Sequence, residues 1–219
     1  MGWIENLEAE FTKTFIRDDR YKVFVTGFKN TILITLVSLL VGLTAGIIIA
    51  IIRYGFAQMK KRKPVTLPKK LVYGLFWIID KILAVYVALM RGIPLLVQLL
   101  IMAFVIMAGF PNKIVVCCIA MGLNSAAYVS EVVRGGINAV DAGQMEAGRS
   151  LGVSAAATIV HIILPQAFKS ALPALCNEGI AVLKETSVVG YIAVVDLTRA
   201  SDLVRSRTMA PMMPLFFIA

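Results

Sequence analysis

The chain has 219 residues, of which 59% are hydrophobic and only 16% are charged, and its mean hydropathy is +0.84. A soluble domain of this length cannot bury so much apolar surface in one core, which excludes an ordinary soluble protein and predicts one embedded in lipid. The net charge of +9 does not indicate nucleic acid, because seven of the 22 Lys and Arg lie between residues 53 and 70, where there is no Asp or Glu. A basic cluster directly after an apolar segment is typical of a cytoplasmic loop that faces anionic lipid.

The first predicted span covers about residues 29–53. It contains an uncharged run, 31–52, that is long enough to cross a hydrocarbon core of roughly 30 Å as a helix. Lipid offers no partner for backbone N–H and C=O groups, so an apolar run of this length is expected to be helical. The polar segment 1–28 precedes this span, and Pro64 and Pro68 interrupt the basic loop after it.

The second hydrophobic region, 71–109, is too long for one simple span, and Pro94 interrupts it. We expect an interfacial elbow that leads into a kinked span over about 84–108. A turn at 109–112 then separates it from a third span over about 114–133.

Residues 134–170 are rich in Gly and in charges of both signs, and they are expected to form a loop with short helices. A fourth span is predicted over about 171–195, followed by a polar segment, 196–208. Residues 209–219 begin another apolar run that is too short to cross a bilayer, which suggests a fifth span cut short. The predicted fold is therefore all-α: a polytopic integral membrane protein with about five transmembrane helices, which together form one transmembrane domain over 29–219.

Orientation follows from the basic residues, which favour the cytoplasmic side. The cluster over 53–70 places that loop inside and the N-terminal segment 1–28 outside the cell membrane. Counting spans then places 134–170 in the cytoplasm and 196–208 outside. Three arginines of the last segment lie on the side that the rule disfavours: Arg199, Arg205 and Arg207.

No cofactor or metal is expected. Cys117, Cys118 and Cys176 lie in apolar stretches without the spacing of metal ligands, and they are expected to be buried small hydrophobic residues. His161 is the single histidine, so a histidine-based metal site or catalytic dyad has no partners. The Gly-rich phosphate-binding loop of ATPases is also absent from the sequence.

A run of fixed residues in the 134–170 loop indicates the class of protein. It consists of Glu146-Ala147-Gly148, Gly152, Ile162 and Leu164-Pro165. This run resembles the coupling motif of importer permeases in the ATP-binding-cassette superfamily, in which Glu-Ala-Ala is followed by Gly, Ile and Leu-Pro at the same spacing. Only Gly148 departs from the pattern, where the family has Ala.

The resemblance implies that this loop docks on a separate cytoplasmic P-loop ATPase. A short helix over 142–151 is expected to dock, Gly152 to allow a sharp turn, and Ser154 to cap a second helix that Pro165 ends. Gly148 is expected to weaken the first helix by roughly 1 kcal/mol relative to Ala. The residues assigned to ATPase coupling are Gln144, Glu146, Ala147, Gly148, Leu151, Gly152, Leu164 and Pro165.

Further segments are similar to the permeases of polar amino-acid importers, of the histidine, glutamine, glutamate, arginine and cystine type. They include 86–98, where Ile93 replaces a family Thr, and 124–137. They also include 184–187, where Glu185 replaces a family Asp. The resemblance covers about residues 27–208. It implies a transport subunit without its own catalysis, a second permease subunit (identical or not) and an extracytoplasmic solute-binding protein.

Polar residues inside the predicted spans are candidates for the solute pathway, because ionisable groups in lipid usually face a cavity. At 100° per residue, Asn124, Tyr128 and Glu131 share one narrow helix face. A guanidinium suits an α-carboxylate and a carboxylate suits an α-ammonium. The residues assigned to solute binding are Arg91, Gln98, Asn124, Tyr128, Glu131, Asn177, Glu178 and Glu185.

Several alternatives stay open at the level of sequence. Lys184 and Glu185 can instead neutralise each other, and permeases of this family can lack a membrane binding site and rely on the receptor. A membrane enzyme needs a converging nucleophile and base, or a metal cluster, which the spans do not offer. A passive channel gives no reason for the coupling loop.

Overall fold

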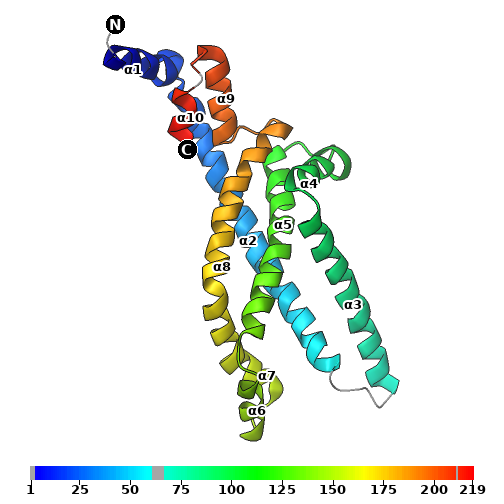
Figure 1. Cartoon of the computed structure of the whole chain (residues 1–219). Helices are drawn as coiled ribbons and strands as arrows, with labels where there is room; N and C mark the ends of the chain where they lie inside the picture. The colour runs from blue at the N-terminus through cyan, green and yellow to red at the C-terminus, as the bar shows by residue number, and fades with distance from the viewer. Residues whose placement is uncertain (1–2, 61–66, 211) are drawn as a thin grey trace. The chain divides into compact units, whose positions relative to one another are not determined.

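The structure is a computed structural model that describes residues 3–60, 67–210 and 212–219 (Figure 1). Long helices dominate these residues, as the sequence predicts. Of the basic segment 53–70, residues 61–66 lie outside them, and the rest continues the helix Tyr21–Lys60 or begins the helix Leu67–Gly92. The helices are α1 (Trp3–Phe11), α2 (Tyr21–Lys60), α3 (Leu67–Gly92), α4 (Leu95–Ile101), α5 (Lys113–Asn138), α6 (Gly143–Ser150), α7 (Ala155–Thr158), α8 (Leu164–Glu185), α9 (Leu197–Thr208) and α10 (Met213–Ile218). Short π-helical turns cover Thr12–Ile16, Met102–Ile106 and Ile159–Ile163, and 3-10 turns cover Arg17–Asp19 and Thr186–Ile192.

Four helical segments within the described ranges are long and apolar enough to cross a membrane. They are Tyr21–Met59, Lys70–Gly92, Lys113–Asn138 and Ala155–Ile192, and a shorter apolar segment covers Leu95–Ile106. The predicted fold class, a polytopic all-α membrane protein, is confirmed. Which residues lie within the bilayer stays a prediction.

The helix around residue 80 differs from the expected elbow. Helix α3 runs without interruption over Leu67–Gly92. The helical conformation is interrupted only at Ile93 and Pro94, before α4. Asp80 therefore lies in the middle of a helix, where its carboxylate pairs with Arg53 of α2 at 3.4 Å. Because that pairing offsets the charge, the helix does not have to end near Asp80.

Pro165 does not end a helix, contrary to the prediction. It is the second residue of α8, and the preceding π-helical turn Ile159–Ile163 leads directly into it. Proline is tolerated in a first helical turn, because the N–H that it lacks is often unpaired there.

Cys176 also differs from expectation, since it is exposed, whereas Cys117 and Cys118 are buried.

The helices divide into two compact units. Unit 1 comprises Met1–Ser38, Leu96–Ala120 and Val182–Ala219, and unit 2 comprises Leu39–Leu95 and Met121–Ala181. In unit 1, Phe15 and Phe24 pack against Ala200 and Val204 of α9. The buried side of α9 therefore joins the apolar core of its unit.

The start of α9 is fastened to α2 within unit 1. The Asp196 carboxylate caps α9 by accepting from the N–H groups of Thr198 and Arg199, both at 3.0 Å. The Leu197 N–H donates to Thr31 Oγ1 at 3.1 Å, and Asn30 Nδ2 donates to the Val195 carbonyl at 2.8 Å. Burial raises the pKa of the Asp196 carboxyl, although its two N–H donors oppose the shift.

In unit 2, α2 approaches α5 closely at two glycines that lie one helical turn apart. A Cβ on Gly42 would lie 2.6 Å from Ser125 Oγ, and one on Gly46 would lie 2.6 Å from the Val129 side chain and 2.8 Å from the Ala126 carbonyl oxygen. Small residues at this spacing let helices pack backbone to backbone in lipid. The Gly42–Gly46 pair therefore sets the distance between the two helices.

Replacing Gly46 with alanine is expected to lower the stability of unit 2 by about 1–3 kcal/mol, because the Ala126 carbonyl cannot move away from the new methyl group without shifting α5. Thermal unfolding in detergent measures the effect. Gly55→Ala, on the same helix with no atom within 4 Å of the added carbon, is the matched control and is expected to be neutral or, through helix propensity, slightly stabilising. Equal unfolding midpoints for the two variants would contradict the close packing.

Candidate functional site: the docking loop and the buried charge cluster

Helix α6 ends in a turn that requires glycine. Gly152 has a φ of +81°, in the left-handed region. The Val153 N–H donates to the Gly148 carbonyl at 3.0 Å, and the Gly152 N–H donates to that of Arg149 at 3.1 Å. This pair of hydrogen bonds is a Schellman motif, which ends a helix and reverses the chain. The turn expected at Gly152 is confirmed.

The next helix starts as expected, because the Ser154 hydroxyl accepts from the Ala157 N–H at 3.2 Å and caps α7. Gly148 is buried where α6 meets α7. A Cβ on Gly148 would lie 2.6 Å from Thr158 Cγ2 and 2.7 Å from Thr158 Oγ1. Thr158 is fully buried, and its hydroxyl donates to the Ser154 carbonyl at 3.0 Å. The absent side chain of Gly148 therefore allows the two helices to touch.

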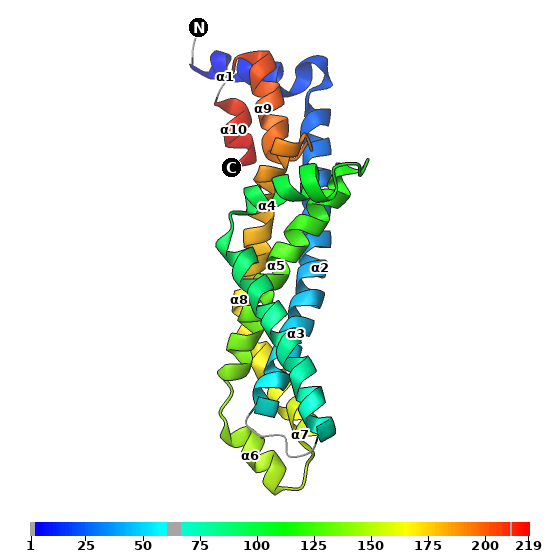
Figure 2. The same cartoon turned by 90° about the vertical axis from the view of Figure 1, so that its right-hand side faces the viewer.

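The opposite side of α6 is exposed. Gln144 and Ala147 are exposed, and Leu151, at the end of the helix, is 83% exposed. Leu164 and Pro165 lie at the start of α8, where Leu164 packs against the cluster of Ile137, Ile163 and Ala167. In Figures 1 and 2, α6 and α7 form the tip of unit 2, beyond the end of α5. The loop therefore presents a small helix with an apolar residue at its outer end.

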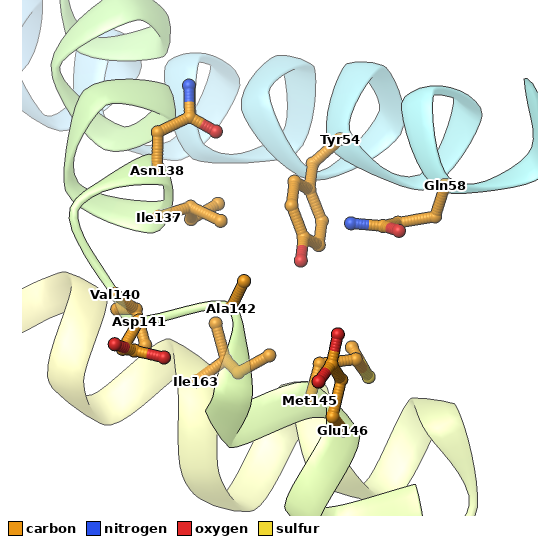
Figure 3. A pocket seen from close by; sticks show the side chains of 10 residues that line it. All are labelled: Tyr54, Gln58, Ile137, Asn138, Val140, Asp141, Ala142, Met145, Glu146 and Ile163. Carbon is orange, nitrogen blue, oxygen red and sulfur yellow. The ribbon is translucent and has the colours of Figure 1, made fainter. Parts of the chain in front are cut away.

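Glu146 of the motif lines a cavity of about 240 Å³ in unit 2. Tyr54 and Gln58 of α2 form one wall, and Met145 lies beside Glu146 on α6. Figure 3 shows the Glu146 carboxylate directed across this cavity toward Tyr54 and Gln58. The remaining lining residues are Ile137, Asn138, Val140, Asp141, Ala142 and Ile163. The motif glutamate thus faces the end of α2.

The polar stripe predicted on α5 faces the end of α3. Asn124 Nδ2 donates to the Met90 carbonyl at 3.1 Å. The Arg91 guanidinium lies 5.4 Å from the centre of the Tyr128 ring, a cation–π distance. Arg91 also pairs with Glu131 at 3.8 Å. Helical periodicity therefore identified three residues that the structure brings together at the end of α3.

Glu131 is the common partner of three arginines. Arg53 of α2 donates to its Oε1 at 3.0 Å, Arg134 of α5 forms a two-pronged ion pair with it, and Arg91 of α3 completes the set. The Glu131 side chain is 18% exposed, and that of Arg53 is 21% exposed. With Asp80 beside Arg53, three cations face two anions, and the cluster ties α2, α3 and α5 together.

This arrangement changes the expected role of Glu131. Its carboxylate is already engaged by guanidiniums, so it can accept from a solute ammonium only if one of them moves away. The sequence interpretation missed Arg53 and Asp80, assigning Arg53 to the basic loop and Asp80 to an elbow. The available signal was a charge of each sign, Arg53 and Asp80, in two consecutive apolar segments, where charges are usually paired.

Glu178 occupies a different environment. Its carboxylate, partly buried on α8, accepts from the Ser125 hydroxyl at 2.8 Å, and no cation within the described residues lies in salt-bridge range of it. Asn177 beside it is exposed. Gln98 and Glu185 belong to unit 1, apart from the other assigned residues in unit 2.

The helical architecture defines a multi-pass membrane protein, and comparison with known proteins identifies its family. A family model described as "Binding-protein-dependent transport system inner membrane component" matches residues 71–219. The arginine transport system permease protein of Bacillus subtilis is 36% identical over 176 residues, which cover 79% of this chain and 72% of the relative. The L-cystine transport system permease protein of the same organism is 31% identical over 210 residues, covering 93% of this chain and 80% of the relative.

Solved structures agree with these relatives. The crystal structure of an amino acid ABC transporter with histidines matches with a TM-score of 0.71 and 35% identity, over 90% of this chain and 85% of that one. The methionine ABC transporter in an inward-facing conformation has the same TM-score at 16% identity, over 92% and 88%, and so shares the fold. The chain belongs to the family of inner membrane components of binding-protein-dependent transport systems, and it is a membrane-spanning permease subunit.

Proposed function

We propose that this permease subunit moves polar amino acids into the cell by alternating access, driven by a separate ATPase chain. The motif resemblance and the amino-acid relatives support the solute class. The pathway is lined by polar residues of the spans, with Arg91 holding the solute carboxylate and Glu178 accepting from its ammonium group. Asn124, Tyr128, Asn177 and Gln98 contribute neutral polar contacts, and Glu185 contributes a further carboxylate.

The exposed face of α6 is the single observation that carries the coupling proposal. A short helix held by a glycine turn, with Ala147 and Leu151 uncovered, suits a groove on a cytoplasmic ATPase. The buried contact of Gly148 with Thr158 transmits a push on α6 to α7, and α7 continues through the π-helical turn into α8. Closure of the ATPase thereby reaches a membrane helix through packed side chains.

Membership of the same family supports a proposed assembly. The chain pairs with a second permease subunit, and a solute-loaded binding protein docks on the outer face. The basic residues over 53–70 support an orientation in which that loop is cytoplasmic and residues 1–28 and 196–208 are outside.

Co-purification tests this function first. The tagged chain is extracted in mild detergent from its native host, and its companions are identified by mass spectrometry. A stoichiometric P-loop ATPase supports the proposal, and uptake of a panel of amino acids into proteoliposomes then identifies the solute. A folded chain without an ATPase would contradict it and favour a channel or a membrane enzyme.

Substitutions on the docking loop should uncouple transport without preventing membrane insertion. Gly152→Val places a β-branched residue at positive φ, which is strained by roughly 1–2 kcal/mol and distorts the end of α6. Gly152→Asn is the matched control, because asparagine tolerates this conformation. We expect the valine variant, and Ala147→Glu on the exposed face, to lose ATPase retention and amino-acid uptake, while the asparagine variant keeps most of both. Normal uptake by Gly152→Val would count against the docking role.

A further inference from the structure

The last turns of helix α2 present two polar side chains to the docking loop. Tyr54 and Gln58 are four residues apart, so they lie on the same side of α2. Both are partly buried, and the Tyr54 ring packs against the apolar cluster around Ile163. Figure 3 shows the Tyr54 hydroxyl pointing into the cavity, with Glu146 on the far side. Hydrogen-bond donors of α2 therefore face the acceptor of α6.

The cavity keeps these groups apart. Its volume of about 240 Å³ has room for roughly eight water molecules. In the part of the chain that the structure describes, no hydrogen bond or ion pair engages the Glu146 carboxylate, the Tyr54 hydroxyl or the Gln58 amide. Movement of α6 toward α2 would bring two donors within reach of one carboxylate.

Helix α6 is joined to the rest of unit 2 by two short links without regular helix. Residues 139–142 connect it to α5, and residues 151–154 connect it to α7. Its closest contact with α7 is at Gly148, next to Thr158. A short helix between two links can shift as a rigid body while the links absorb the change in backbone angles. The space in front of Glu146 gives that shift a direction, toward α2.

The end of α2 that lines the cavity is fastened to two other helices. Arg53 pairs with Asp80 of α3 at 3.4 Å and with Glu131 of α5 at 3.0 Å. Phe56 is buried, and its ring centre lies 5.4 Å from that of Tyr73 of α3. A push on this end of α2 is therefore passed on to α3 and α5 through paired and packed side chains.

We infer that Tyr54 and Gln58 are positioning residues for the docking loop: closure of the ATPase moves α6 into the cavity, where the Glu146 carboxylate accepts hydrogen bonds from both. Hydrogen bonds to a charged carboxylate are stronger than those between neutral groups, so two of them hold the closed position. This inference rests on the proposed function and goes beyond it. It adds a second route for the motion, from α6 to α2, to the route through Gly148 and α7.

Cysteine cross-linking in the complete transporter, with its ATPase, tests the movement of α6. The exposed Cys176 is first replaced with serine, and Gln58→Cys/Met145→Cys then places one thiol on each wall of the cavity. A disulfide requires close approach of the two Cβ atoms, so cross-linking should be about fivefold faster with ATP and vanadate, which trap the ATPase closed, than without nucleotide. The control pair, Gln58→Cys/Gln144→Cys, has its second thiol on the exposed side of α6 and should cross-link in neither state.

Substitutions that remove only the donors test their role in coupling. Tyr54→Phe/Gln58→Met keeps the size of both side chains, and it is expected to lower the maximal rate of amino-acid uptake about tenfold while the ATPase is retained. In a Glu146→Gln background, the same pair should have little further effect, because the groups act together. Tyr21→Phe makes the same loss of a hydroxyl at the other end of α2 and should leave uptake unchanged.

Four results overturn the inference. The first is a cross-linking rate that does not depend on nucleotide or is matched by the control pair. The second is normal uptake by Tyr54→Phe/Gln58→Met, and the third is loss of the ATPase or of folded protein from that variant, which makes the two residues merely structural. The fourth is a full further loss in the Glu146→Gln background. If the wild-type complex itself carries no ATPase and takes up no amino acid, the proposed function fails, and the inference fails with it.

Discussion

Replacing Gly148 with alanine is expected to impair the transporter, although alanine is the better helix former. Helix propensity alone favours the substitution by roughly 1 kcal/mol. The added methyl group, however, would lie 2.6 Å from Cγ2 of Thr158, which is buried, β-branched and held by its hydrogen bond to the Ser154 carbonyl. Overpacking of this kind costs about 1–3 kcal/mol, so the steric effect outweighs the propensity.

The expected loss is specific to the docking loop. A shift of one or two kcal/mol away from the docking conformation lowers its population about five- to thirtyfold. ATPase retention in detergent and amino-acid uptake should fall together, while membrane insertion stays normal. Both quantities are measured on the same preparations.

A second substitution distinguishes the steric explanation from a general need for glycine. Thr158→Ala removes the two nearest atoms that the new methyl group meets and leaves only Thr158 Cβ, at 3.2 Å, so Gly148→Ala/Thr158→Ala should recover much of the lost coupling. The two residues touch, and their effects should therefore be non-additive. If the double variant is as impaired as the sum of the single ones, the Gly148–Thr158 contact is not the cause.

The departure from the family motif at Gly148 thus has a physical explanation that the sequence alone did not supply. In the sequence, Gly148 counted as a weakened helix position. In the structure, it is matched by a threonine ten residues further on, and only the packing of α6 on α7 shows the pairing. Two other features of the loop were predictable because they depend on local chemistry: Gly152 must adopt positive φ, and Ser154 must cap the next helix.

In the membrane helices, too, some features could be predicted from the sequence and others depend on packing between helices. Apolar runs identified the existence of the spans, because lipid leaves the backbone no alternative to a helix. Their ends were less predictable, since α2 continues past Arg53, where a charge suggested a boundary. Whether a charge ends a span depends on a partner from another helix, and the rotation of α2 against α5 is set by the packing of Gly42 and Gly46.

Periodicity also predicted part of the candidate pathway. Asn124, Tyr128 and Glu131 share a face by arithmetic alone, and they do meet the end of α3. Arg53, Arg91 and Arg134 converge on the Glu131 carboxylate only because α2, α3 and α5 pack side by side. The sequence of one helix alone does not predict that packing. The binding roles of these residues stay predictions.

Glu131→Gln is expected to destabilise unit 2 substantially. The substitution removes the charge that three guanidiniums share, and it leaves Arg53, which is only 21% exposed, with Asp80 as its remaining anion at 3.4 Å. Breaking a buried ion pair by removing one partner costs about 3–5 kcal/mol, and the near-half exposure of Arg91 and Arg134 reduces this to about 2 kcal/mol here. Thermal unfolding in detergent should show a clearly lowered midpoint.

Asp80→Asn provides the matched control, because it makes the same change of charge in the same cluster but removes only one longer contact, to Arg53. Its midpoint should fall much less than that of Glu131→Gln. The comparison also separates two roles for Glu131. If it holds the three helices together, the glutamine variant loses stability first, and uptake falls because less folded transporter remains. If it binds the solute ammonium, the variant keeps its stability and instead needs more solute for half-maximal uptake, and the helix-tying role assigned to the cluster is wrong.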